Sequence, residues 1–353
     1  MKKKTILVAV LIMLFMWMMP GCGDSEPVEI KIVSEEISWP IGETTVYATI
    51  TRPESGENLP GIVFVPGSGP TDRDWNSPLL PGKNGSAALL AEELASQGYV
   101  TIRYDKRFAG PNAEENLPLL IGKISIESHL EELRGAVQVL IERSDVDDSR
   151  IFTLANSEGC IHAINYQLQA GDRQFAGLIL AAPPGQSVGD LARTQISAQL
   201  AGMPGADEIM KLYDEAVDGF LSTGTMEPDA SLPEGIKLFL QSLANPANMP
   251  FTQELWQRDI TPDMKKIDVP VLVVIGKKDI QVNWEFDGTK LQAAAEGMNT
   301  ITFSFPENAN HVLKYEELPR EEINLADPNY NGPDTVLDSE ALDIIINWLD
   351  TNT

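Results

Sequence analysis

Positions 150–159 of the chain carry the run Arg-Ile-Phe-Thr-Leu-Ala-Asn-Ser-Glu-Gly. Its β-branched and aromatic first half is typical of a buried strand, and the residues that follow the run have a helical pattern. A serine at such a strand-to-helix turn has a strained backbone and an exposed hydroxyl. The turn requires small residues two places before and two places after the serine, here Ala155 and Gly159. Ser157 is therefore the candidate nucleophile, provided that a base, an acid and an oxyanion loop occur in the right context.

The rest of the chain alternates apolar β-type runs with helical periodicity. Because strands that are apolar on both faces are covered on both faces, this pattern predicts an α/β fold, with a mostly parallel central sheet and helices on both sides. The expected strands are 30–37, 44–51, 62–65, 100–104, 151–154, 176–181, 269–275 and 300–305, and the expected helices are 87–97, 126–142, 161–169, 285–295 and 339–349.

Residues 186–262 break this alternation. The segment has no strand signal, but it has several amphipathic stretches rich in Met, Leu and Phe. An insertion of this kind between two strands predicts a helical cap over the carboxyl edge of the sheet, where ligands bind in such folds. The core then comprises residues 30–185 and 263–353.

The N-terminus has the pattern of an export signal. Three lysines at positions 2–4 precede the apolar stretch 6–19 and the small-residue site Pro20-Gly21-Cys22. This pattern resembles a bacterial lipobox and predicts a lipoprotein signal peptide at 1–21, lipidation at Cys22 and a tether at 22–29. The alternative is an uncleaved membrane anchor. Both alternatives place the protein outside the cytoplasm, membrane-anchored on the cell surface or the periplasmic side.

The composition excludes several other classes of function. The formal net charge is −26, from 26 basic and 52 acidic residues, which argues against nucleic acid as a partner and against electrostatic docking on anionic lipid. Membrane contact is therefore expected only through the N-terminal lipid. The second of the two cysteines, Cys160, has no intrachain partner if Cys22 is lipidated, and we interpret it as a packing residue. No Cys/His cluster has the spacing of a metal site, so no metal is expected.

The general base follows from the three histidines of the chain. His129 lies in a charged helical run and is predicted to be a solvated surface residue. His162 lies beyond Ser157 in the same helix and is predicted to point into the helix packing. His311 follows the strand 300–305 directly, and a base at the carboxyl end of a strand can face the nucleophile. His311 is therefore the predicted base.

The acid is found by the same reasoning. Asp279 leaves the buried strand 269–275 at the edge where Ser157 and His311 are expected, and the order Ser, Asp, His is that of an α/β-hydrolase triad. Asp279 could instead cap the helix that follows. Asp287 is a poorer candidate, because it falls inside that helix.

The oxyanion requires two backbone N–H groups. The loop Val65-Pro-Gly-Ser-Gly-Pro70 follows a strand, and its glycines allow close backbone approach. We expect the amides of Ser68 and Glu158 to be the two donors, each worth about 3 kcal/mol in the transition state. The segment 71–74 that follows is expected to hold this loop through ion pairs, and Lys106 and Arg107 are also read as structural.

These blocks together resemble the α/β-hydrolase superfamily over nearly all of residues 30–350. Within it, five blocks in order are similar to the serine aminopeptidase-like and dienelactone hydrolase-like esterases; the blocks are Pro66–Asp74, Arg103–Arg107, Asn156–Gly159, Gly276–Val282 and Asn310–Lys314. The resemblance implies a carboxylesterase that acts on small acyl esters and needs no cofactor. Two departures are Ala155 in place of Gly and Cys160 where a second Gly is common, and neither removes a catalytic group.

The sequence thus predicts a serine carboxylesterase that works through an acyl-enzyme, with the triad Ser157, His311 and Asp279. The modest, mostly apolar cap leads us to expect short acyl chains. A serine peptidase or an acyltransferase with the same triad is the enzymatic alternative, with acidic cap residues such as Asp207 and Asp214 available to a cationic substrate. A non-enzymatic binding lipoprotein on the cell surface is the remaining alternative.

Overall fold

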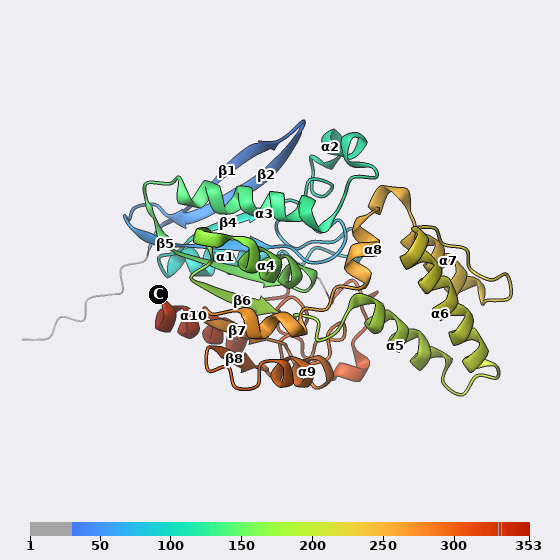
Figure 1. Cartoon of the computed structure of the whole chain (residues 1–353). Coiled ribbons are helices and arrows are strands. Elements are labelled where there is room, and N and C mark those ends of the chain that lie inside the picture. Colours follow the sequence, from blue (N-terminus) through green and yellow to red (C-terminus); the bar gives the residue numbers. More distant parts are fainter. Residues whose placement is uncertain (1–29, 331, 333) are drawn as a thin grey trace, which may run out of the picture.

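The computed structural model describes residues 30–330, 332 and 334–353, so the predicted signal peptide, Cys22 and the tether lie outside the described residues. Eight strands form one sheet in the order β1-β2-β4-β3-β5-β6-β7-β8 (Figure 1). The pairs β1/β2 and β2/β4 are antiparallel, and every other neighbouring pair is parallel. The strands are β1 Ile32–Ile41, β2 Thr44–Pro53, β3 Leu59–Val65, β4 Val100–Tyr104, β5 Val146–Asn156, β6 Gly177–Ala181, β7 Val271–Val274 and β8 Ile301–Ser304.

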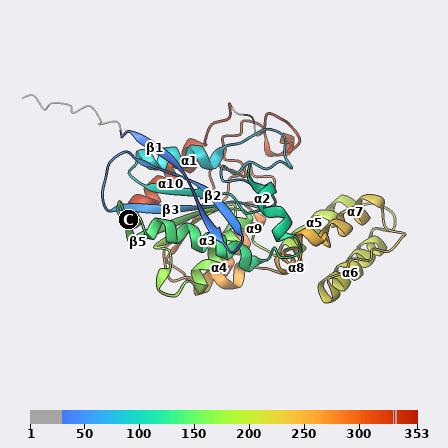
Figure 2. The same ribbon diagram turned by 90° about the horizontal axis from the view of Figure 1, so that it is seen from above.

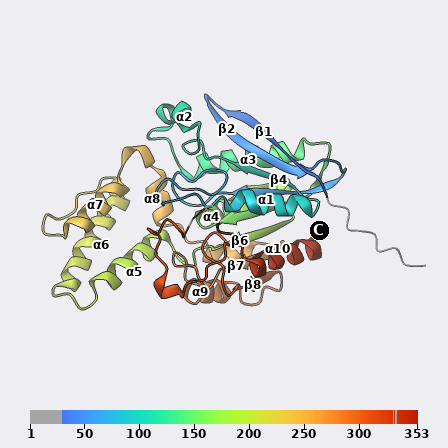
Figure 3. The ribbon, with the colours of Figure 1, turned by 180° about the vertical axis from the view of Figure 1, so that it is seen from behind.

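Helices cover both faces of this sheet, as predicted. Alternate residues of one strand point to opposite faces, so Val63 packs with helices α3 and α4, whereas Ile62 packs with α1 and α10. Figure 1 views the sheet from the side of α3 and α4, and Figure 3 from the side of α1 and α10. The helices are α1 Ser86–Ser96, α2 Ala113–Leu120, α3 Ile126–Ile141, α4 Glu158–Gln169, α5 Val188–Leu200, α6 Ala206–Thr223, α7 Glu234–Leu243, α8 Phe251–Trp256, α9 Phe286–Ala294 and α10 Ser339–Asn352, with short 3₁₀ helices at Gly171–Arg173, Pro246–Asn248, Thr261–Lys266 and Arg320–Glu322.

Several element bounds differ from the sequence prediction; β5, for example, begins at Val146, five residues before the predicted start at 151. Helix α4 begins at Glu158, immediately after the candidate nucleophile, three residues earlier than the predicted start at 161. Helix α2 was not predicted, because Pro118 interrupts its pattern. Within the described residues, we find no helix that combines the length and the apolar character needed to cross a membrane.

The insertion 186–262 is helical, and it has its own small core. Tyr213 and Phe220 of α6 pack with Leu240 of α7 and Trp256 of α8. Figure 2 shows α5, α6 and α7 standing to one side of the sheet. In Figure 1 the arrow of β6 points toward the insertion, which therefore lies beyond the carboxyl end of that strand.

Candidate active site

The predicted turn at Ser157 is present between β5 and α4. Ser157 has φ 55° and ψ −121°, and a positive φ is a backbone conformation that a non-glycine residue rarely adopts. Its N–H donates to the carbonyl oxygen of Ala181 at 2.8 Å, which ties the turn to the end of β6. A Cβ at Gly159 would lie 2.6 Å from the carbonyl oxygen of Val65, so only glycine fits there. The requirement for a small residue is thus a close approach between α4 and the end of β3.

Asp279 and His311 are hydrogen-bonded to each other. His311 Nδ1 lies 2.8 Å from Asp279 Oδ2, and Asp279 is fully buried. The other carboxylate oxygen accepts the N–H groups of Gln281 at 2.7 Å and Val282 at 3.0 Å. Asp279 therefore does both things that the sequence offered as alternatives. It accepts backbone N–H groups of the turn after β7, as a capping residue would, and it bonds His311.

Asp287, the weaker alternative acid, lies apart from His311. Its two oxygens accept the N–H groups of Gly185 at 3.0 Å and Asn283 at 2.9 Å. Burial raises the pKa of this carboxyl above its usual value. Asp287 thus fastens the start of α9 to the segment that leaves β6.

Sequence reasoning missed Asn156, the residue before the candidate nucleophile. Its Nδ2 donates to the carbonyl oxygen of His311 at 2.9 Å, and its side chain is buried. The bond joins the turn after β5 to the loop after β8, three strands away in the sheet. A polar residue at the buried end of a strand was the available signal, but its partner lies 155 positions away in the chain.

Ser157 and His311 line the same pocket, which has a volume of about 220 Å³. Among the described residues, neither the Ser157 hydroxyl nor His311 Nε2 has a hydrogen-bond partner, so both are free to bond a ligand or each other. The other walls come from the loop between β3 and α1, from Gln281 and from Tyr330.

No residue of the insertion 186–262 lines this pocket within the described part of the chain. The insertion is helical, as predicted, but it contributes no wall to this pocket, and its role as a cap over the carboxyl edge of the sheet stays a prediction. Amphipathic periodicity predicts that a segment is helical, but it does not determine against which part of the protein the helices pack. The pocket is instead lined by Trp75 and Leu80, which belong to the loop after β3.

This loop is held by ion pairs, as the sequence predicted. Arg73 bonds Asp105 with its Nη2 at 2.7 Å, and Arg103 bonds Asp74. Thr71 Oγ1 donates to the carbonyl oxygen of Ser68 at 2.6 Å. Arg103 and Asp105, from the end of β4, thus anchor the loop that lines the pocket.

The two predicted oxyanion donors belong to two segments that touch each other, the loop after β3 and the turn before α4. A Cβ at Gly67 would lie 3.0 Å from Asn156 Oδ1 and 3.4 Å from Ser157 Cβ, so the loop backbone touches the turn. Glu158 is the first residue of α4, and the first N–H groups of a helix have no intrahelical acceptor. Neither the Ser68 N–H nor the Glu158 N–H has a protein acceptor among the residues that the structure describes.

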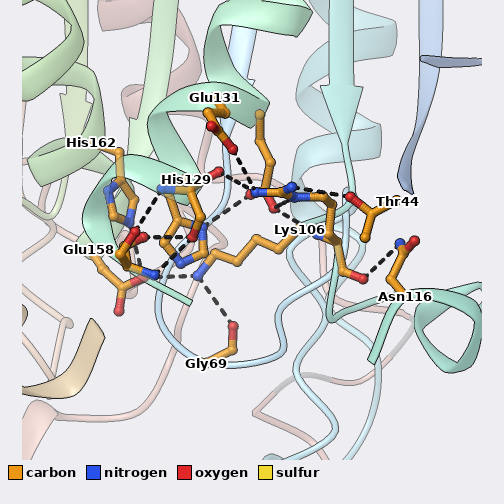
Figure 4. A network of polar contacts seen from close by, with 12 residues as sticks. Thr44, Gly69, Lys106, Asn116, His129, Glu131, Glu158 and His162 are labelled. Atoms are coloured by element: carbon orange, nitrogen blue, oxygen red, sulfur yellow. Dashed lines mark hydrogen bonds and ion pairs between the residues drawn. The ribbon is translucent and has the colours of Figure 1, made fainter. Parts of the chain in front are cut away.

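A buried polar network lies behind the turn (Figure 4). Glu158 Oε1 is 2.9 Å from Lys106 Nζ and 3.3 Å from His162 Nε2, and all three side chains are at least nine-tenths buried. Burial would raise the pKa of Glu158, but the charge of Lys106 and the hydrogen bond from His162 outweigh it and hold that pKa well below its usual value. Burial lowers the pKa of His162 to about 4. The prediction that His162 lies in the helix packing is confirmed.

The prediction for His129 is wrong, because this side chain is buried. Its ring lies 4.7 Å from those of both His162 and Phe251, measured between centroids, and its Nδ1 is 3.1 Å from Glu132 Oε2. Glu132 is held in turn by Arg107, whose Nε donates to it at 2.9 Å. The charged run around His129 looks solvated in the sequence because the positive charge that pairs with Glu132 comes from Arg107, which lies just beyond the end of β4.

His129, Glu158 and His162 are also of the types that bind metal ions. One potential ligand atom of each lies within 4.8 Å of the others, which the sequence spacing did not indicate. The ammonium of Lys106 already bonds Glu158 Oε1, so a divalent cation would meet a buried positive charge beside its only carboxylate ligand. We therefore assign no metal to this cluster.

Cys160 is fully buried in α4, and its Sγ lies 3.3 Å from the carbonyl oxygen of Ala155. Burial raises the pKa of its thiol well above the usual value. These properties confirm that Cys160 is a packing residue, because a reactive cysteine needs an accessible thiolate.

Comparison with known proteins identifies the fold. No known family model matches the chain. The esterase EstD of Thermotoga maritima is 27% identical over 267 residues, which are 75% of this chain; the chain spans 57% of that protein's length.

Solved structures similar to the chain include the proline iminopeptidase of Mycobacterium smegmatis, with a TM-score of 0.52, 14% identity and coverage of 90% of this chain and 98% of that one. The α/β hydrolase GrgF of Penicillium sp. sh18 has a TM-score of 0.52 and 16% identity, with coverage of 91% and 99%. At these identities the likeness shows the fold alone. The chain has the α/β-hydrolase fold, as the sequence predicted.

Proposed function

We propose that this protein is a serine hydrolase that cleaves carboxylic esters of small acyl groups. The observation that carries the proposal is the pocket that Ser157 and His311 both line, with Nδ1 of His311 bonded to buried Asp279. A serine needs a base to accept its proton, and the base needs an acid that fixes its tautomer. The esterase name of the Thermotoga maritima relative supports the same reaction class.

The proposed reaction begins with attack of Ser157 Oγ on the ester carbonyl carbon, while His311 Nε2 accepts the hydroxyl proton. Asp279 stabilises the imidazolium that forms. The negative charge of the tetrahedral intermediate falls on the former carbonyl oxygen, toward which the N–H groups of Ser68 and Glu158 donate. Collapse of the intermediate expels the alcohol, which takes the proton from His311 and leaves an acyl group on Ser157.

Hydrolysis of this acyl-enzyme uses the same groups. His311 takes a proton from water as the water attacks the acyl carbon, and it returns that proton to Ser157 Oγ when the acid leaves. The pocket volume of about 220 Å³ is below the range of about 300–1,000 Å³ that is usual for drug-sized ligands, which supports a small acyl group.

The test is hydrolysis of p-nitrophenyl acetate by the full chain, beside an amino-acid p-nitroanilide of the same size. We expect turnover of the ester that is lost on treatment with a fluorophosphonate, and little turnover of the anilide. Faster turnover of the anilide would favour the peptidase alternative. Asp207 is exposed and Asp214 is half-buried and paired with Arg193, and neither lines the pocket, which weakens that alternative.

The export proposal concerns the N-terminus. A lysine-rich start, an apolar stretch and Cys22 support a lipoprotein anchored outside the cytoplasm. Strand β1 runs parallel to β4, because both pair antiparallel with β2, so it begins at the edge opposite the carboxyl strand ends, and a membrane anchor before it would leave the pocket accessible. Metabolic labelling with palmitate tests the proposal: label is expected in the wild type and absent from Cys22→Ala. Equal labelling of both proteins would contradict it.

A further inference from the structure

Lys106 is a buried lysine whose ammonium has three acceptors. It lies two residues beyond the end of β4 and is 1% exposed. Its Nζ donates to the carbonyl oxygen of Gly67 at 2.5 Å, to that of Gly69 at 3.2 Å and to Glu158 Oε1 at 2.9 Å (Figure 4). We propose that Lys106 is a positioning residue that holds both halves of the oxyanion hole. This inference rests on the proposed function.

The first half is the peptide unit between Gly67 and Ser68. This unit is planar and trans, so its C=O and its N–H point in opposite directions. The bond from Lys106 fixes the carbonyl oxygen of Gly67, and it thereby fixes the direction of the Ser68 N–H. Ser68 lines the pocket, and its N–H has no protein acceptor among the described residues, so this N–H is available to an oxyanion that binds there.

The second half is Glu158, whose own N–H is the other proposed donor. Its carboxylate points away from the pocket into the buried network, where Lys106 and His162 hold it. Fixing this side chain fixes the first residue of α4 directly behind Ser157. One ammonium therefore bonds the loop after β3 and the helix after β5, so the two donors are kept in one relative position.

The sheet order explains why the side chain comes from β4. Strand β3 lies between β4 and β5, so a residue at the end of β4 reaches β5 only across the end of β3. Neighbouring strands are about 4.8 Å apart, a distance that a long side chain can bridge. A lysine ammonium has three donors on a compact head, which matches three convergent acceptors better than a planar guanidinium does.

The neighbouring Arg107 provides a matched control. It forms an equally buried ion pair with Glu132, but this pair touches neither proposed donor. The variants are Lys106→Met with Glu158→Gln, and Arg107→Met with Glu132→Gln. Each double variant removes both charges of a pair, so no unpaired charge is left in the interior.

The full chain is assayed with p-nitrophenyl acetate and with a short alkyl boronic acid, which forms a tetrahedral adduct on an active serine. For Lys106→Met/Glu158→Gln we expect kcat to fall at least about tenfold and the boronate inhibition constant to rise in parallel, with KM within about threefold. For the control pair we expect a lower melting temperature, with kcat within about twofold of the wild type.

Equal kcat values for the two double variants would overturn the inference while leaving the esterase proposal intact. A wild type without Ser157-dependent turnover would overturn both. If the Lys106 variant does not fold, a crystal structure of the wild-type boronate adduct decides. The inference requires a boronate oxygen within hydrogen-bond distance of the N–H groups of Ser68 and Glu158, with Lys106 on Gly67. A boronate oxygen bonded elsewhere would overturn it.

Discussion

The substitution Asp279→Asn tests the proposed triad at its most buried member. In the wild type, Oδ1 of Asp279 accepts two backbone N–H groups, and Oδ2 accepts from His311 Nδ1 at 2.8 Å. The asparagine oxygen can keep both backbone bonds, so the turn after β7 is retained. Its NH₂ group then donates to His311 Nδ1, which forces the ring proton onto Nε2. His311 in that tautomer cannot accept the proton of Ser157.

The expected loss in kcat is about 10⁴-fold, or about 5 kcal/mol of transition-state stabilisation, as for other triads with the wrong tautomer. Steady-state hydrolysis of p-nitrophenyl acetate measures it. Asp287→Asn is the control, because this buried carboxylate also accepts two N–H groups but has no contact with His311. That control should lose about 1–3 kcal/mol of folding free energy and keep kcat within about twofold. A kcat for Asp279→Asn within tenfold of the wild type would refute the reasoning.

Three further predictions concern the elbow, the buried histidine and the pocket. Gly159→Ala places a Cβ 2.6 Å from the carbonyl oxygen of Val65, so its melting temperature should fall by several degrees, whereas Gly219→Ala, with open space around it in α6, should equal or exceed the wild type. His162 has a folded pKa of about 4 against 6.5 unfolded, so the unfolded state binds its proton first as the pH falls; about 3 kcal/mol of stability, present above pH 6.5, should be lost between pH 6.5 and 4. In urea unfolding, the free energy of unfolding of His162→Gln should change less steeply with pH in this range than that of the wild type. An unchanged slope would count against a lowered pKa for His162. The small pocket predicts that kcat/KM falls at least about tenfold from p-nitrophenyl butyrate to the decanoate; a rise along that series would contradict it.

The geometry of the site could be predicted because it depends on strand ends. Parallel strands place their carboxyl ends at one edge, so Ser157, Asp279 and His311 could each be placed there from the strand that precedes them. The bond between Asp279 and His311 follows from that placement. The roles of these residues remain proposals that the experiments above address.

The network behind the site could not be predicted, because its contacts join residues far apart in the chain. Lys106 bonds backbone carbonyl oxygens, which any residue type can present, so no pattern in the sequence identifies its partners. His129 lies among glutamates that look solvated, although Glu132 is buried against Arg107 from another element. The position of the insertion 186–262 depends on packing that periodicity does not encode.

The most direct test of the central claim is to trap the acyl-enzyme. The full chain is mixed with p-nitrophenyl acetate, quenched in acid during turnover, digested and analysed by mass spectrometry. We predict an acetyl group on the peptide that contains Ser157, and no acetyl group on the corresponding peptide of Ser157→Ala, whose turnover should fall by orders of magnitude. Rapid turnover in Ser157→Ala, or an acetyl group on another residue that accounts for the turnover, would contradict the assignment of Ser157 as the nucleophile.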